Sequence, residues 1–310
     1  MRSFTLRLRA GERIVTEVGC LAASLECEAY TPYAKLTATF LSQGEDYGAV
    51  NGIALECDGK QVFFGIADSI RQYRRNGQCF VRVQSRSFTS VLAQNEIVPG
   101  LHLNMTVEHL LTGFYTFPNV SYEPYAGSGY IFVKDGSSMW DSVINFAYKL
   151  TGHHPFIRGN TVCFTPPEDG AHVELSAARV LEYGVMQDTT RLVSMYHMAD
   201  ASDNYDAYQL ENSPAVQADI VRHKQLLLDR QYLSEPEQAL QFRCQFSQRG
   251  WRSKYVTYSG FEAEQLCDRV SFGTFLQNAR ICRIRMVLGG SGVRTTLWAY
   301  DDGFYHSAEQ

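Results

Sequence analysis

The stretch that decides the fold is VFFGIADSIRQYRRNGQCFVRVQSRSFTSVLAQN, from Val62 to Asn95. Asn76-Gly77 in its middle predicts a β-hairpin, because these residue types adopt the positive φ angles that a two-residue turn requires. The turn fixes the register and places Ile70 opposite Val83 on one face. The other face then carries two arginines and two aromatic residues: Arg71, Tyr73, Phe80 and Arg82. A short helix from Ser87 to Asn95 should follow directly.

The composition is that of a folded chain with a β-rich interior. The 310 residues are 45% hydrophobic, 20% charged and 13% aromatic. That length suggests about two domains. A net charge of −5 gives the molecule as a whole no general attraction for nucleic acid or anionic membranes. No apolar run approaches the roughly 20 residues that a membrane helix needs.

The N-terminus and the cysteines indicate synthesis in a cytoplasm. MRSFTLRLRAGERIV alternates as a strand does and has no apolar signal-peptide core. The eight cysteines are dispersed and form no C-x-x-C pair. We therefore expect reduced thiols inside the fold, without disulfides or a metal site.

Three regions differ in pattern. Residues 1–95 read as short strands and predict a first small β-barrel domain. Residues 96–170 predict an α/β insert with a strand, a helix and a hairpin, in which Ser138 and Asp141 form a capping box at the start of the helix. Residues 171–310 return to strands and predict a second β-barrel domain, with a strand at residues 191–198 and a polar loop at residues 199–213. Two β-rich regions around an insert are consistent with a diverged structural duplication.

The residues that usually carry chemistry do not form a recognisable site. His153 and His154 are adjacent and cannot face one ligand together, so we interpret them as a helix-end pair. The acidic loop at residues 200–206 lacks the spacing of a calcium loop. The glycine-rich stretch at 289–292 lacks a following helix and a lysine, so we interpret it as a hairpin turn. We predict no catalytic, metal-binding or cofactor-binding residue and no enzyme activity.

The arginine-rich hairpin is the main electrostatic feature. Arg71 and Arg82 should lie directly opposite each other, which is repulsive unless a partner or an anion intervenes. Three interpretations are open: a solvated hairpin tip, a protein interface and a nucleic-acid contact. Arginine and aromatic residues are enriched in protein interfaces, and the negative net charge argues against nucleic acid. Arg71, Tyr73, Phe80 and Arg82 are therefore our candidate subunit-interface residues.

Two segments resemble a known family. CFVRVQSRSFTSVLAQNE at Cys79–Glu96 and SGYIFVKDGSSMWDSVINFAYKLTGHHPFIRGNTVCFTPP at Ser128–Pro167 resemble baseplate hub proteins of contractile phage tails, the late control protein D and Mu-like relatives. The resemblance implies a β-dominated α+β fold with two small tube-like β-barrels and an inserted β-α-β-β unit.

The same resemblance implies a structural, non-enzymatic role in the virion tail baseplate. Three copies would form a pseudo-sixfold ring that joins the tail tube to the spike. The expected partners are the chain itself as a homotrimer, a tail tube protein and a separate spike protein. No small-molecule substrate, cofactor, membrane or nucleic acid is expected as a partner.

An alternative comes from the segment Val133–Val143, which resembles the opening of a LysM module. LysM modules bind the glycan of peptidoglycan and run strand, helix, helix, strand. Here one helix leads into a hairpin, so the second helix is missing. The alternative function is a peptidoglycan-binding tail accessory protein.

Overall fold

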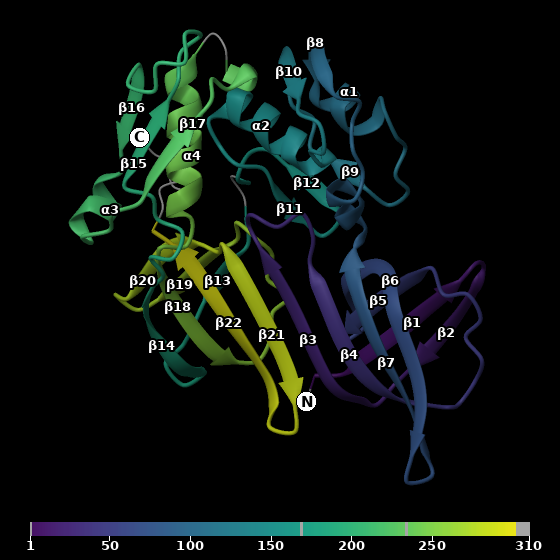
Figure 1. Cartoon of the computed structure of the whole chain (residues 1–310). Helices are drawn as coiled ribbons and strands as arrows, with labels where there is room; N and C mark the ends of the chain where they lie inside the picture. The colour runs from purple at the N-terminus through teal and green to yellow at the C-terminus, as the bar shows by residue number, and fades with distance from the viewer. Residues whose placement is uncertain (1, 168–169, 233–234, 302–310) are drawn as a thin grey trace.

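A large curved sheet dominates the molecule, and two smaller units lie at one side of it (Figure 1). The computed structural model describes residues 2–167, 170–232 and 235–301. Most of the secondary structure in these residues is strand, which confirms the expected β-dominated α+β class. None of the helices in the described ranges is long and apolar enough to cross a membrane.

The large sheet has eleven strands, and every neighbouring pair in it is antiparallel. From one edge to the other its strands are β14 (Val180–Gln187), β18 (Arg252–Ser259), β22 (Gly292–Tyr300), β21 (Arg283–Gly289), β3 (Cys20–Glu28), β4 (Lys35–Ser42), β7 (Gln78–Ser87), β6 (Lys60–Arg75), β5 (Gly52–Cys57), β1 (Phe4–Ala10) and β2 (Arg13–Glu17).

The N-terminal and C-terminal strands belong to this one sheet because β3 pairs with β21. Leu25 lies opposite Met286 at this joint. The two expected barrels therefore do not close separately, and no closed barrel is detected among the residues described. The physical reason is that the backbone N–H and C=O groups of β3 and β21 hydrogen-bond to each other. In two separate closed barrels, β3 would pair with another N-terminal strand and β21 with another C-terminal strand.

The β6–β7 hairpin, which the Asn76-Gly77 turn predicted, forms in the expected register. Asn76 and Gly77 have φ angles of 49° and 76°, as a turn of the predicted type requires. Ile70 lies opposite Val83, and Arg71 lies opposite Arg82. The segment after it forms a 3-10 helix, η1 (Phe88–Ala93), which is tighter and shorter than the helix expected from Ser87 to Asn95.

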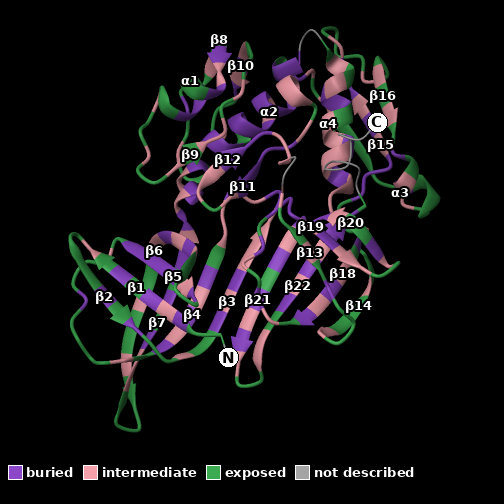
Figure 2. Cartoon of the chain, turned by 180° about the vertical axis from the view of Figure 1, so that it is seen from behind, coloured by how far each residue is buried: buried purple, intermediate pink, exposed green. Residues whose placement is uncertain are grey.

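Alternating burial makes a core on one side of the N-terminal strands. Apolar side chains of β1 and β5 pack in one cluster with those of β3, β4 and β7. Leu6, Phe40 and Val81 in this cluster are fully buried. Figure 2 shows the consequence, since buried and exposed residues alternate along the strands of the sheet.

The middle unit is built around α2 (Met139–Thr151). Its other elements are β8 (Gly100–Thr106), α1 (Val107–Thr112), β9 (Ser121–Tyr122), β10 (Ser128–Val133), β11 (Phe156–Arg158) and β12 (Thr161–Cys163). The predicted capping box of Ser138 and Asp141 is present, and Gly152 ends the helix with a φ of 72°. The β-α-β-β order is as expected, but β10 pairs with β8, whereas β11 and β12 pair in a separate sheet with β9.

The third unit is built around α4 (Pro236–Gln248). The same unit contains β15 (Met195–Met198), β16 (Tyr208–Glu211), α3 (Ser213–Gln217), β17 (His223–Leu226) and η2 (Arg230–Tyr232). A separate sheet of β13 (His172–Glu174), β19 (Arg269–Phe272) and β20 (Leu276–Arg280) lies beside β22 of the large sheet (Figure 1). The strand β15 is shorter than the pattern predicts, and the segment after it contains β16. The domain boundaries after residues 95 and 170 stay a prediction.

Candidate assembly surface

The predicted interface residues gather on one face of the β6–β7 hairpin, which we call the hairpin face: Arg71, Tyr73, Phe80 and Arg82. Tyr73 and Phe80 lie opposite each other, and their rings stack with centroids 5.3 Å apart. The guanidinium of Arg71 lies 5.5 Å from the centre of the Tyr73 ring. The register that the turn imposes thus brings all four side chains together, whereas their role as an interface is a proposal.

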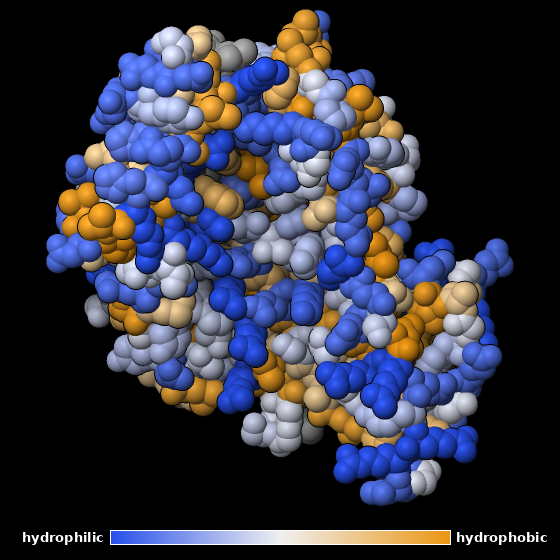
Figure 3. Space-filling view, viewed as in Figure 1, coloured by the Kyte–Doolittle hydropathy of each residue, from blue (hydrophilic) through white to orange (hydrophobic). Residues whose placement is uncertain are grey.

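The hairpin face carries positive charge without internal compensation. Arg71 and Arg82 are exposed, and neither has an ion pair within the part of the chain that the structure describes. Arg74 and Arg75 follow at the exposed tip, where Figure 3 shows hydrophilic side chains projecting from the lower right of the molecule. Arg86, farther along β7, differs because Asp68 binds it at 2.7 Å. The unpaired arginines are therefore available to a carboxylate on another molecule.

The two outer edges of the large sheet are the surface that sequence reasoning missed. The β14 edge exposes four large apolar side chains, Leu181, Tyr183, Val185 and Met186. The β2 edge exposes Ile14 and the adjacent Val18, which are 55% and 59% accessible. Within the described residues, each of these two strands is paired with another strand on one side only. An apolar edge strand with free backbone groups is a template for pairing with another chain.

The sequence of β14 itself indicates a strand that can pair with another chain. Val180–Gln187 reads VLEYGVMQ, with no lysine, arginine or proline to discourage pairing. The segment becomes a candidate contact only when the strand order is known, because that order makes β14 an outer strand of the sheet. The β2 edge could not have been found in the same way, because Arg13–Glu17 alternates apolar and polar residues like any surface strand.

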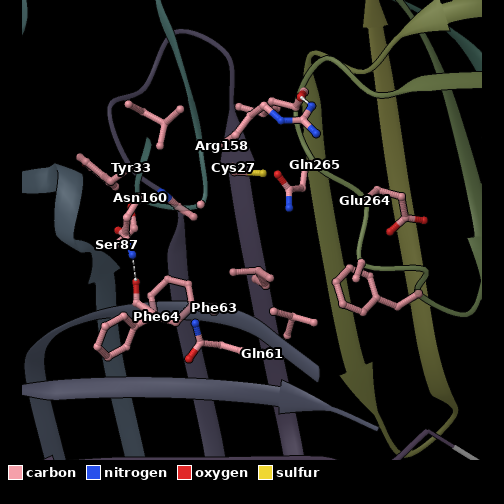
Figure 4. A pocket seen from close by; sticks show the side chains of 18 of the residues that line it. Cys27, Tyr33, Gln61, Phe63, Phe64, Ser87, Arg158, Asn160, Glu264 and Gln265 are labelled. Atoms are coloured by element: carbon pink, nitrogen blue, oxygen red, sulfur yellow. Dashed lines mark hydrogen bonds between the residues drawn. The ribbon is translucent and has the colours of Figure 1, made fainter. Parts of the chain in front are cut away.

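A cavity of about 270 Å³ lies where the N-terminal strands, the β11–β12 turn and the segment 261–266 meet (Figure 4). The Gln265 side chain lies beside Cys27 in this view. Arg158 donates to the Leu266 carbonyl at 2.6 Å and to Asp268 at 3.0 Å, and Asn160 donates to the Phe64 carbonyl at 3.0 Å. These polar groups hold the three parts of the chain together.

The titratable groups of this cavity do not form a nucleophile and base. Burial raises the pKa of the Cys27 thiol to about 12, so it stays protonated at neutral pH. Burial, with Asp268 nearby, raises the pKa of Glu264 to about 7. Glu264 accepts hydrogen bonds from the Tyr258 hydroxyl and from the Glu262 backbone at 3.2 Å. The bond from Tyr258 ties the segment around Glu264 to β18.

The other residues considered for chemistry also lie in structural settings. His154 is buried against Tyr30, Trp140 and Phe246, and burial lowers its pKa to about 3. Gly289 pairs with Gly292 in a hairpin turn, as predicted. In residues 2–167, 170–232 and 235–301, no group of three or more His, Cys, Asp or Glu residues is arranged to hold a metal ion.

Comparisons with known proteins identify the fold. No protein-family model matches the sequence, and no curated protein sequence matches it either. Solved structures do match. The tail protein from Neisseria meningitidis MC58 has a TM-score of 0.70 and 17% identity, and the match covers 98% of both chains. The 43 kDa tail protein of prophage MuSo2 from Shewanella oneidensis has a TM-score of 0.66 and 13% identity, over 97% of this chain and 99% of that one.

A third match comes from a secretion machine. A component of the type VI secretion system of E. coli has a TM-score of 0.58 and 8% identity, over 95% of this chain and 76% of that chain. At these identities the likeness establishes a shared fold. The chain therefore has, over almost its entire length, the fold of phage tail proteins and of a type VI secretion component.

Proposed function

We propose that this chain is a structural, non-enzymatic protein of a phage-type tail or a related injection device, and that it acts as a baseplate hub. Three copies form a ring with pseudo-sixfold character, which joins a tail tube protein on one side to a spike protein on the other. The observation that carries the proposal is the sheet: eleven strands whose two outer strands have no second strand partner in the described residues and expose apolar side chains. The shared fold with tail proteins supports the same conclusion.

The two edges explain how a ring could close. The β14 edge and the β2 edge are different surfaces, so contact between them is heterologous, and a heterologous contact repeated with a closing rotation makes a ring. Pairing would satisfy the free backbone groups of both strands and cover their apolar side chains. An obligate ring of this kind would bury roughly 2,000 Å² or more per contact.

The hairpin face would form a second contact of the assembly. Its stacked rings and its unpaired arginines suit a surface that presents carboxylates, either on a sister copy or on the adjoining tube or spike protein. The proposed role implies a location in the virion baseplate after synthesis in the bacterial cytoplasm. The glycan-binding alternative gains no support from the fold, since α2 leads directly into the β11–β12 hairpin without a second helix.

The decisive experiment blocks each edge separately. The variant Leu181→Lys/Val185→Lys alters the β14 edge, and Ile14→Lys/Val18→Lys alters the β2 edge. All four positions are exposed, so each monomer should fold, which circular dichroism checks. We expect native mass spectrometry to show trimers for the wild type and monomers for each variant alone. An equal mixture of the two variants should give a dimer, because one intact pair of edges remains.

The matched control is Val221→Lys/Leu227→Lys, which changes two apolar residues that are more exposed than the edge residues and lie outside both edge strands. It should assemble as the wild type does. A wild-type chain that stays monomeric at high concentration contradicts the proposal. Dimers formed by one edge variant on its own would instead indicate a symmetric contact and would contradict the ring.

A further inference from the structure

A groove of about 560 Å³ lies between α2, α4 and the strands β15 and β17, away from both edges of the large sheet. On the face shown in Figure 3 the surface is hollowed in the upper part of the molecule, between the two smaller units. Three aromatic side chains, Tyr196, Phe242 and Phe246, line the groove together with aliphatic residues. Such a lining is typical of a surface that receives an apolar side chain.

The charged residues around the groove are almost all of one sign. Arg191, Lys224, Arg243 and Arg249 line it, against the single carboxylate of Asp141. That carboxylate is already engaged, since it accepts from the Ser138 backbone at 2.9 Å in the capping box. In a molecule of net charge −5, four cations around one apolar groove are a local reversal of sign.

The four cationic side chains differ in the interactions that they already make within the chain. Arg243 binds Asp229 at 2.8 Å, and its buried Nε has no partner. Arg249 donates to the Phe246 carbonyl at 2.5 Å and lies over the Phe246 ring. Arg191 and Lys224 are exposed, and within the described parts of the chain neither makes an ion pair. Burial lowers the pKa of Arg249, and the nearby charge of Arg191 lowers it further.

We propose that this groove binds a peptide segment of a partner protein, in which carboxylates flank an apolar or aromatic anchor. The anchor would lie on Phe242 and Phe246, while its carboxylates would pair with Arg191 and Lys224. The cationic residues around the groove favour an acidic partner. The aromatic residues that line it favour a peptide with an apolar side chain over a free anion. The inference goes beyond the ring, because none of the residues that line this groove belongs to β2 or β14.

The test probes an array of short synthetic peptides with the labelled full chain. We expect the bound peptides to be enriched in Asp and Glu together with Phe, Leu or Trp. The best of them should bind the variant Arg191→Glu/Lys224→Glu about ten-fold more weakly, with an affinity that also falls as salt rises. Both positions are exposed, so the variant should fold.

The matched control is Lys60→Glu/Arg294→Glu, which makes the same change in net charge at two exposed positions outside the groove and should bind the peptide normally. Equal loss in the control would show unspecific attraction and would overturn the proposal. So would an array without enrichment, unchanged binding after the anchor is replaced by Ala, or displacement by inorganic phosphate alone. Stronger binding of a single-stranded oligonucleotide, or of a second copy of the chain, would assign the groove to another occupant. The ring variant Leu181→Lys/Val185→Lys should bind the peptide as the wild type does, which separates this test from that of the ring.

Discussion

At the scale of single residues, the like-charged pair Arg71–Arg82 is the feature that a monomer alone does not explain. The two residues lie directly opposite each other on β6 and β7. Replacing one of them by a carboxylate would turn a repulsive cross-strand pair into an attractive one. We predict that Arg82→Glu stabilises the isolated chain by about 0.5 kcal/mol and weakens assembly.

Chemical denaturation of the edge-blocked monomer measures the first effect, and native mass spectrometry of the otherwise unchanged chain measures the second. Arg75→Glu at the hairpin tip is the control, because Arg75 lies opposite Gln78 and gains no ion pair across the hairpin. A variant that is more stable and assembles normally would show that the hairpin face is a solvated surface.

Glu264 gives a prediction about pH. Burial raises its folded pKa from 4.5 to about 7, so between these values the folded chain keeps a proton that the unfolded chain has lost. The free energy of unfolding should therefore fall as pH rises through this window, by up to about 1.4 kcal/mol per pH unit. The variant Glu264→Gln, which cannot ionise, should lose this slope.

Thermal unfolding across the window, on the wild type and on Glu264→Gln, measures the difference. Glu12→Gln changes an exposed carboxylate at a turn and should leave the slope unchanged. Parallel curves for the wild type and Glu264→Gln would contradict a buried, protonated Glu264.

At the scale of elements, β6 changes its partners at Gly65. This residue lies opposite Ile53 of β5 on one side and opposite Ser87 of β7 on the other. A Cβ here would lie 2.1 Å from the Arg86 carbonyl oxygen and 2.7 Å from the Phe63 ring. Because a backbone atom has to move, we predict that Gly65→Ala destabilises the chain by about 3 kcal/mol.

The matched control is Gly59→Ala in the β5–β6 turn, where nothing lies within 4 Å of an added Cβ. Its φ of 79° makes alanine strained, so a loss of about 1 kcal/mol is expected from the backbone alone. Chemical denaturation compares the two variants. Equal losses would mean that the close approach at Gly65 has no energetic consequence.

The elements that the sequence predicted well are those determined locally. The Asn76-Gly77 turn, the capping box at Ser138 and the β11–β12 hairpin depend on a few adjacent residues and form as expected. Elements determined by distant partners were predicted less well. β15 begins at Met195, later than expected, because its extent is set by pairing with β16 and β17, and their pairing leaves no signal in a single sequence.

At the scale of the whole molecule, the joint between β3 and β21 makes one cooperative unit of the large sheet. Met286 is fully buried there and packs in the cluster formed by the N-terminal strands. We predict that Met286→Ala costs about 3 kcal/mol and accelerates hydrogen exchange of the most protected amides in β4 and in β22 alike.

Hydrogen exchange with mass spectrometry checks this prediction. The control is Thr5→Ala, because Thr5 lies in β1, next to the outer strand β2 and away from the β3–β21 joint. Faster exchange on one side of the joint only would mean that the two halves unfold independently. The pairing itself could not be predicted, because residues 25 and 286 meet through the complete fold. For the same reason the sequence indicated the hairpin face but not the edges, which exist only once the strand order is known.

The joint has a consequence for biogenesis. While the ribosome is still making the chain, β3, β4 and β7 can pair with one another, but β21 emerges only after the middle and third units have been made. Until β21 has been made, the backbone groups on one side of β3 are unpaired and can pair with a neighbouring nascent chain. Termination before β21 should therefore yield insoluble fragments, and the interval before β21 emerges is when this protein most needs a chaperone.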